Sequence, residues 1–229
     1  RVLFRSPTVY RRLAPNIYLG VGWSLHAQHA AQINSDDPQK IHDTAQGESV
    51  LSSGSSVELS WDDRDFVPNP RKGQYADLRY TRFTPDVGSD TRFDEYQLHY
   101  SRYHSLDDKN VLAWEMDGAF TQGDVPWTMM PLLGSNQRMR GYYEGRYRDK
   151  NAVSGQLEYR RKLDWRHGVV GWLGAGTMGP SFHSLDDGRW LPSAGVGYRF
   201  EFKPRVNVRL DYGIGKGSSG FYFQVGEAF

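Results

Sequence analysis

Apolar and polar residues alternate with period two along most of this chain, and this alternation limits the fold more than any other feature. The even positions between residues 206 and 214 are all apolar: Val206, Val208, Leu210, Tyr212 and Ile214. The odd positions between them are polar or glycine. This pattern is typical of a β-strand with one apolar and one polar face. Since no helix-period segment and no run of about 18 apolar residues competes with it, the sequence predicts an all-β fold.

The same test identifies ten predicted strands. They cover residues 17–25, 57–61, 76–80, 96–100, 112–120, 151–165, 169–178, 194–202, 206–214 and 220–229. Nearly all of residues 169–178 are apolar or glycine, so the pattern does not show which of them share a face. Residues 1–10 form either an eleventh strand or an unpaired lead-in. The long connections are 31–54, 84–91, 122–150 and 180–190, and the short ones are 65–73, 106–109, 166–168, 203–205 and 217–218. Long loops at one end and tight turns at the other are the plan of an outer-membrane barrel.

Composition supports a membrane barrel over its main alternative, a soluble β-sandwich. Aromatic residues make up 14% of the chain and there are 25 glycines, as expected for many strands with aromatic girdles at the membrane interfaces. The polar faces mix Gly, Arg, Asp, Glu, Tyr and Gln, which suits a barrel lumen. We therefore predict a single domain, residues 1–229, folded as an antiparallel transmembrane β-barrel of about ten to twelve strands. The net charge of +1, with no separate basic block, argues against a nucleic-acid partner.

Three passages resemble motifs of the BamA/TamA superfamily of outer-membrane assembly and translocation barrels. The segment Met139-Arg140-Gly141-Tyr142, inside the long connection 122–150, resembles the family's VRGF/Y motif. Residues 59–80 (LSWDDRDFVPNPRKGQYADLRY) resemble its strand–turn–strand unit, and residues 11–23 (RRLAPNIYLGVGW) resemble the first strand of its shorter members. The family's barrel usually has about sixteen strands, so this chain is either a smaller barrel or lacks upstream strands.

The end of the chain also resembles a known signal. Residues 220–229 (GFYFQVGEAF) alternate and stop on an aromatic residue. They are similar to the C-terminal targeting signature of outer-membrane barrels, which is carried here by Phe221, Phe223, Val225 and Phe229. The resemblance implies that the last strand is read by the barrel assembly machinery.

The resemblance also assigns roles within the long connection. It implies that residues 122–150 fold into the lumen and that Arg140 contacts Glu158, which the alternation independently places on a polar face. A guanidinium in a lumen needs carboxylate or carbonyl partners, and Gly141 allows close backbone approach. The family's second partner, an aspartate, falls on Gly174 in this chain. Glu158 is therefore the single partner that the sequence predicts.

The function that the resemblance implies is insertion, assembly or translocation of proteins, or of lipids, at the bacterial outer membrane. The expected partners are outer-membrane lipids and lipopolysaccharide, together with client proteins or periplasmic chaperones. In a simpler interpretation, the basic residues of the long connection only face lipid phosphates. Two alternative functions stay open: a small passive pore or structural barrel, and the membrane anchor of a larger polypeptide with an upstream passenger.

Neither catalysis nor a cofactor is predicted. Asp62, Asp63 and Asp65 crowd one turn and hint at a metal, but in the family this stretch shapes a periplasmic turn. The seven histidines are scattered, and the serines near His99, His104 and His183 do not form the pattern of a catalytic triad. With no cysteine, the chain also lacks thiolate metal ligands. We therefore expect no catalytic residue and no metal site.

Overall fold

A computed structural model describes residues 2–28, 49–185 and 190–229. Twelve strands form one sheet in these ranges. They are β1 (Val2–Arg5), β2 (Thr8–Ala14), β3 (Ile17–Gln28), β4 (Val50–Asp62), β5 (Gly73–Phe83), β6 (Phe93–Ser105), β7 (Asn110–Gly123), β10 (Asn151–Lys162), β11 (His167–Gly179), β12 (Leu191–Lys203), β13 (Val206–Gly215) and β14 (Ser218–Val225). The prediction of an all-β antiparallel fold with about ten to twelve strands is confirmed.

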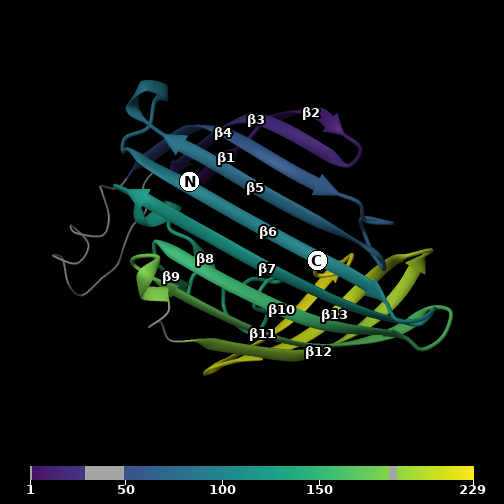
Figure 1. The fold of residues 1–229 in the computed structure, drawn as a ribbon. Helices are drawn as coiled ribbons and strands as arrows, with labels where there is room; N and C mark the ends of the chain where they lie inside the picture. Colours follow the sequence, from purple (N-terminus) through teal and green to yellow (C-terminus); the bar gives the residue numbers. More distant parts are fainter. Residues whose placement is uncertain (1, 29–48, 186–189) are drawn as a thin grey trace.

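From β3 to β14 the order in the sheet follows the order in the chain, and every neighbouring pair is antiparallel (Figure 1). The strands tilt across the molecule and the sheet curls, so that β13 and β14 lie behind β6 and β7 in this view. Within the described ranges β14 pairs with β13 alone, so the sheet is open at this edge.

The predicted eleventh strand is present as two short pieces. β1 pairs with the end of β3 and β2 pairs with its beginning, so both lie along the same edge. Pro7 lies between them, and its carbonyl accepts a hydrogen bond from the backbone N–H of Trp23 at 3.0 Å. Since proline has no N–H to donate to a ladder, the edge strand is interrupted there.

The connections predicted to be short lie at one end of the sheet, with one exception. They join β4 to β5, β6 to β7, β10 to β11 and β12 to β13 at the end that we call the tight-turn end, and the longest of them, between β4 and β5, covers residues 63–72. The predicted short connection 217–218, between β13 and β14, lies at the opposite end, among the long loops. The predicted loops 31–54 and 180–190 fall partly outside the described residues. β4 begins at Val50, earlier than predicted. The prediction missed this part of the strand because its serine-rich sequence shows no alternation.

The long connections carry small elements of their own. These are the 3-10 helices η1 (Pro85–Val87), η2 (Trp127–Met129) and η3 (His183–Leu185), and the two-residue strands β8 (Leu132–Leu133) and β9 (Tyr147–Arg148), which pair with each other. In the part of the chain that the structure describes, no helix has the length and apolar character needed to cross a membrane.

The two faces of the sheet are the reverse of those in a soluble protein. On β13, Asn207, Arg209 and Asp211 are buried, whereas Tyr212 and Ile214 are half exposed. The other predicted apolar faces are likewise exposed or half-buried, for example Leu157 at 48%. We call the buried polar side the inner face and the apolar side the outer face. An apolar outer face around a polar inner face is the arrangement of a transmembrane barrel.

Candidate functional site

The long connection between β7 and β10 returns to the inner face of the sheet. Its residues 139–142, which we call the motif segment, lie against β13 and β14. The backbone N–H of Gly141 donates to the Tyr222 hydroxyl at 2.8 Å, and its carbonyl accepts from the Ser218 hydroxyl at 2.6 Å. The Tyr142 hydroxyl donates to the Pro192 carbonyl at 2.6 Å. The motif segment is thus bound to the last two hairpins of the sheet.

Arg140 is the fully buried centre of this site. Its guanidinium donates to Asp211 Oδ2 at 2.6 Å and to Glu158 Oε2. It also lies over the ring of Trp172, 3.7 Å from the centroid, where a desolvated cation–π contact contributes about 2 kcal/mol. Glu158 and Trp172 are register partners on β10 and β11. One side chain therefore joins the connection to β10, β11 and β13.

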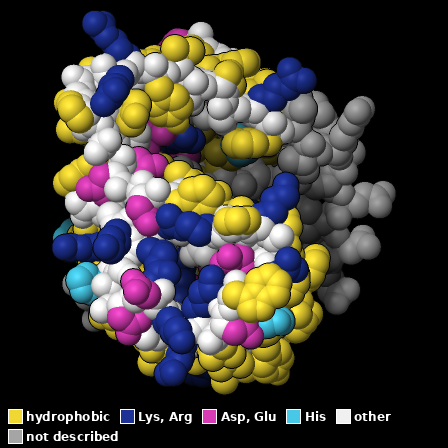
Figure 2. All heavy atoms as spheres, turned by 90° about the vertical axis from the view of Figure 1, so that its right-hand side faces the viewer, with side chains coloured by type: hydrophobic (Ala, Val, Ile, Leu, Met, Phe, Trp, Pro, Cys, Tyr) yellow, Lys and Arg dark blue, Asp and Glu magenta, His cyan; other side chains and the backbone are white. Residues whose placement is uncertain are grey.

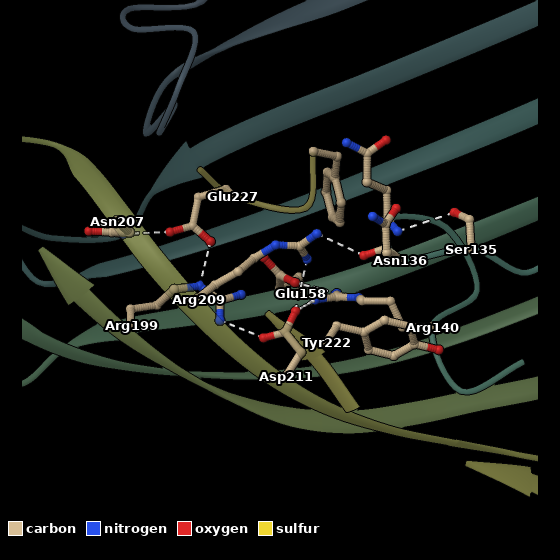
Figure 3. Close-up of polar contacts among 12 residues, drawn as sticks. Ser135, Asn136, Arg140, Glu158, Arg199, Asn207, Arg209, Asp211, Tyr222 and Glu227 are labelled. Carbon is tan, nitrogen blue, oxygen red and sulfur yellow. Dashed lines mark hydrogen bonds and ion pairs between the residues drawn. The ribbon is translucent and has the colours of Figure 1, made fainter. Parts of the chain in front are cut away.

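Further charged side chains extend this contact into a network, which we call the ion cluster (Figure 3). Its members are Arg140, Glu158, Arg160, Arg199, Arg209, Asp211 and Glu227. Asp211 alone accepts from three guanidinium groups. Because each carboxylate has at least one guanidinium partner, the burial of these charges is offset by charge-assisted hydrogen bonds.

The other residues of the motif segment fill the space around Arg140. Met139 and Tyr142 are buried and form an apolar cluster with Leu133 and Leu191. Gly141 has φ 111°, and a Cβ there would lie 2.6 Å from the Ile214 carbonyl carbon. Only glycine fits this position without displacing β13. The segment approaches the strand so closely because β13 itself carries glycine at position 213, under the Arg140 carbonyl.

The expectation that Glu158 is the single partner of Arg140 is wrong. Asp211 is the second carboxylate, and it comes from β13 rather than from β11. At Gly174, where the resemblance implies an aspartate, a Cβ would lie 2.8 Å from Gln156 Cγ and 3.5 Å from Met139 Sδ. These side chains occupy the space that an aspartate would need. The sequence places Asp211 on a polar face, but only the sheet order brings it to Arg140.

The basic residues of the long connection differ in their surroundings. Arg138 contacts Asp117, with Nε 2.9 Å from Oδ1. Arg148 donates to the Trp127 carbonyl and lies over its ring. Arg146 is more exposed and donates to the Gly217 carbonyl at 3.0 Å. Arg140 is the one whose side chain is fully buried.

The predicted targeting residues do not share one strand. Phe221, Phe223 and Val225 point outward from β14 and are exposed. β14 ends at Val225, and the chain turns at Gly226, where φ is 94°. Phe229 then lies against the Tyr103 ring, and its carbonyl oxygen accepts a hydrogen bond from Arg160 at 2.7 Å. The predicted continuation of the strand to Phe229 is therefore wrong, because Gly226 reverses the chain toward the inner face.

The tight-turn end is basic (Figure 2). Lysine and arginine side chains gather in the middle of this face, interleaved with acidic ones. A cavity of about 210 Å³ opens here and is lined by Arg160 and Arg199 of the ion cluster, together with Arg161, Arg166 and Glu227. Arg160, Arg199 and Glu227 of the ion cluster thus face a cavity that opens at this end.

The aspartate-rich turn between β4 and β5 is held by internal hydrogen bonds. Asp62 pairs with Arg64 at 2.7 Å, and the Asp65 carboxylate accepts from the Arg71 N–H and from the Arg205 side chain. Burial alone raises the pKa of Asp65, but these hydrogen bonds outweigh it and hold the pKa below its usual range. The carboxylates shape the turn, as the sequence analysis predicted.

Comparison with known proteins confirms the resemblance seen in the motifs. The crystal structure of BamA from Haemophilus ducreyi lacking POTRA domains 1–3 has a TM-score of 0.72 and 16% sequence identity, and the match covers 98% of this chain and 53% of that chain. The toluene transporter TodX from Pseudomonas putida has a TM-score of 0.39 and 10% identity over 93% of this chain and 63% of its own. No curated protein sequence gives a significant match.

These likenesses have clear limits. At 16% identity the BamA structure shows the fold alone, and this chain spans about half of that structure's length. The TodX likeness is too low to support an argument. The family itself is shown by sequence, because the Omp85 superfamily domain matches residues 6–229, nearly the whole chain. The chain is a member of the Omp85 superfamily.

Proposed function

We propose that this protein inserts, assembles or translocates other proteins at the bacterial outer membrane, without catalysing a covalent reaction. One observation carries the proposal: the motif segment connects the inner faces of β10, β11 and β13 through the buried Arg140. Membership of the Omp85 superfamily supports it. The partners in this proposal are client proteins or periplasmic chaperones on the periplasmic side, and lipids and lipopolysaccharide around the outer face.

The contacts of the motif segment suggest how it takes part. Gly141 is hydrogen-bonded to Tyr222 on β14, the last strand, at 2.8 Å. Lys216, in the turn before β14, donates its N–H to the Tyr142 hydroxyl at 2.8 Å. A segment bound to the last strand and to the turn before it fixes the position of this sheet edge. In our proposal, an incoming strand pairs with that edge by β-augmentation. The role of Phe221, Phe223 and Val225 as a targeting signature stays a prediction.

A folding assay in vesicles tests this proposal. The chain is reconstituted into phosphatidylethanolamine–phosphatidylglycerol vesicles, and an unfolded outer-membrane barrel is added as the client. Folding of the client is followed by its heat-dependent shift on a gel and by protection from protease. We expect faster folding than in vesicles that hold a passive porin, and a smaller acceleration with Arg140→Ala.

Two outcomes would overturn the proposal. If client folding is no faster than with the passive porin, the insertion function is wrong. If client folding is not accelerated and the vesicles release an encapsulated dye, the chain is a passive pore instead. The matched control is Arg146→Ala, which changes an exposed arginine of the same connection and should leave the acceleration intact.

A further inference from the structure

A second polar group lies on the inner face, on the strands β6 and β7 beside the ion cluster. His99 on β6 and Asp117 on β7 are register partners, and Glu115 lies two positions before Asp117 on the same face of β7. His99 Nδ1 is 2.7 Å from Asp117 Oδ1. One ligand atom from each of the three side chains lies within 4.8 Å of the others. The group thus brings an imidazole and two carboxylates together.

The carboxylates of this group are only partly satisfied. Glu115 is 2% exposed, and its Oε2 has no hydrogen-bond partner among the described residues, although Gln156 donates to Oε1. Asp117 Oδ2 is also buried without a partner in that part of the chain. A buried carboxylate oxygen without a partner is costly. Both oxygens are therefore available to a further ligand.

The charge around the group favours a cation. The arginine that contacts the group is Arg138, whose Nε is 2.9 Å from Asp117 Oδ1 and whose side chain is 50% exposed. Arg140 also interacts electrostatically with Glu115, but it is paired with Glu158 and Asp211. Arg138 also approaches His99 Nδ1, at 3.4 Å from its Nη2. Since this arginine already occupies the Asp117 oxygen nearest to His99, any cation that binds here competes with it.

We propose that His99, Glu115 and Asp117 bind a divalent transition-metal ion such as Zn²⁺, with Arg138 as the internal competitor for Asp117. Imidazole with carboxylates is a ligand set for zinc, whereas Mg²⁺ and Ca²⁺ prefer oxygen ligands alone. Donors placed about 2.1 Å from a tetrahedral zinc are about 3.4 Å apart. Rotation of the side chains closes the group to that spacing, and water completes the coordination.

This site has a consequence for the motif segment. Arg138 immediately precedes Met139, so an ion that displaces it from Asp117 frees the start of the segment while Arg140 stays in the ion cluster. The arrangement goes beyond the proposed function, because metal binding to the three ligands does not depend on client insertion.

Calorimetric titration of the folded chain in detergent micelles with Zn²⁺ tests this inference. We expect one ion per chain, a loss of at least about tenfold in affinity for His99→Ala and for Glu115→Gln, and tighter binding for Arg138→Ala. His104→Ala is the matched control, because His104 lies on the same strand outside the group, and it should bind zinc as the parent chain does. Mg²⁺ should give no specific heat.

The inference is overturned if the His99 and His104 variants bind zinc equally, or if Arg138→Ala binds it no more tightly than the parent chain. Should Glu115→Gln fail to fold, as judged by its β signal in circular dichroism, the histidine and arginine variants still decide the result. Co²⁺ gives an independent measurement: its visible absorption should appear with the parent chain and be lost with His99→Ala.

Discussion

Replacing Arg140 with alanine tests the structural role of the motif segment most sharply. The substitution removes a fully buried guanidinium from Asp211 and Glu158 and a cation–π contact with Trp172. Breaking a buried ion pair from one side costs about 3–5 kcal/mol, because the remaining charge stays buried. We expect Arg140→Ala to lower the free energy of unfolding within this range.

The structure places the effect at the lower end of the range. After the substitution Glu158 still accepts from Arg160, and Asp211 still accepts from Arg199 and Arg209. Neither carboxylate is left without a guanidinium. We therefore expect a loss of about 3 kcal/mol, which is about a hundredfold in the unfolding equilibrium.

Urea unfolding of the protein in phospholipid vesicles, followed by tryptophan fluorescence, measures this loss. Arg146→Ala is the control, because Arg146 makes one exposed hydrogen bond to Gly217 and should contribute no more than about 1 kcal/mol. Arg140→Lys should fall between the two, since an ammonium lacks the planar fork that reaches both carboxylates. Equal losses for Arg140→Ala and Arg146→Ala would refute the reasoning.

Three other substitutions test separate parts of the structure. Gly141→Ala should cost clearly more than Gly145→Ala in the same unfolding assay: both positions have positive φ, but only at Gly141 would the Cβ meet a strand backbone. Leu210→Arg on the outer face should cost about 2–4 kcal/mol in a bilayer, and no loss there would mean that this face does not meet lipid. Asp65 has a lowered pKa, so its stabilising effect is present above its ordinary pKa of about 3.9 and is lost as pH falls through the lower folded value. Stability of the parent chain measured from pH 6 downward should therefore fall more steeply in acid than that of Asp65→Asn, and parallel curves would contradict this.

The strands were predictable because each one carries its own evidence. A period of two is a local property, so nine of the ten strands and their outward faces could be predicted from alternation alone. Nearly all of residues 169–178 are apolar or glycine, so the pattern does not give the faces of that strand. The pairing of Arg140 with Glu158 could be predicted only through the family resemblance. Where alternation fails, the prediction fails with it, as at the serine-rich start of β4.

The missed features all depend on contacts between distant segments. Asp211 lies 71 positions after Arg140, and no local pattern selects it from the other polar residues of the inner faces. The turn at Gly226 depends on its positive φ. The sequence does not show which glycines adopt a positive φ. The grouping of His99 with Glu115 and Asp117 requires the register of β6 against β7, which a sequence does not give.

The central claim is that the sheet crosses the membrane with its apolar outer face in lipid and its polar face around the motif segment. Since the chain has no cysteine, single cysteines on β6 can be labelled with a fluorophore and tested with a quencher dissolved in the lipid. The account predicts strong quenching at Leu98 and Tyr100, which are on the outer face, and weak quenching at Gln97 and Ser101, which are on the inner face. Quenching that does not alternate along β6, or that is strongest at Gln97 and Ser101, would contradict it.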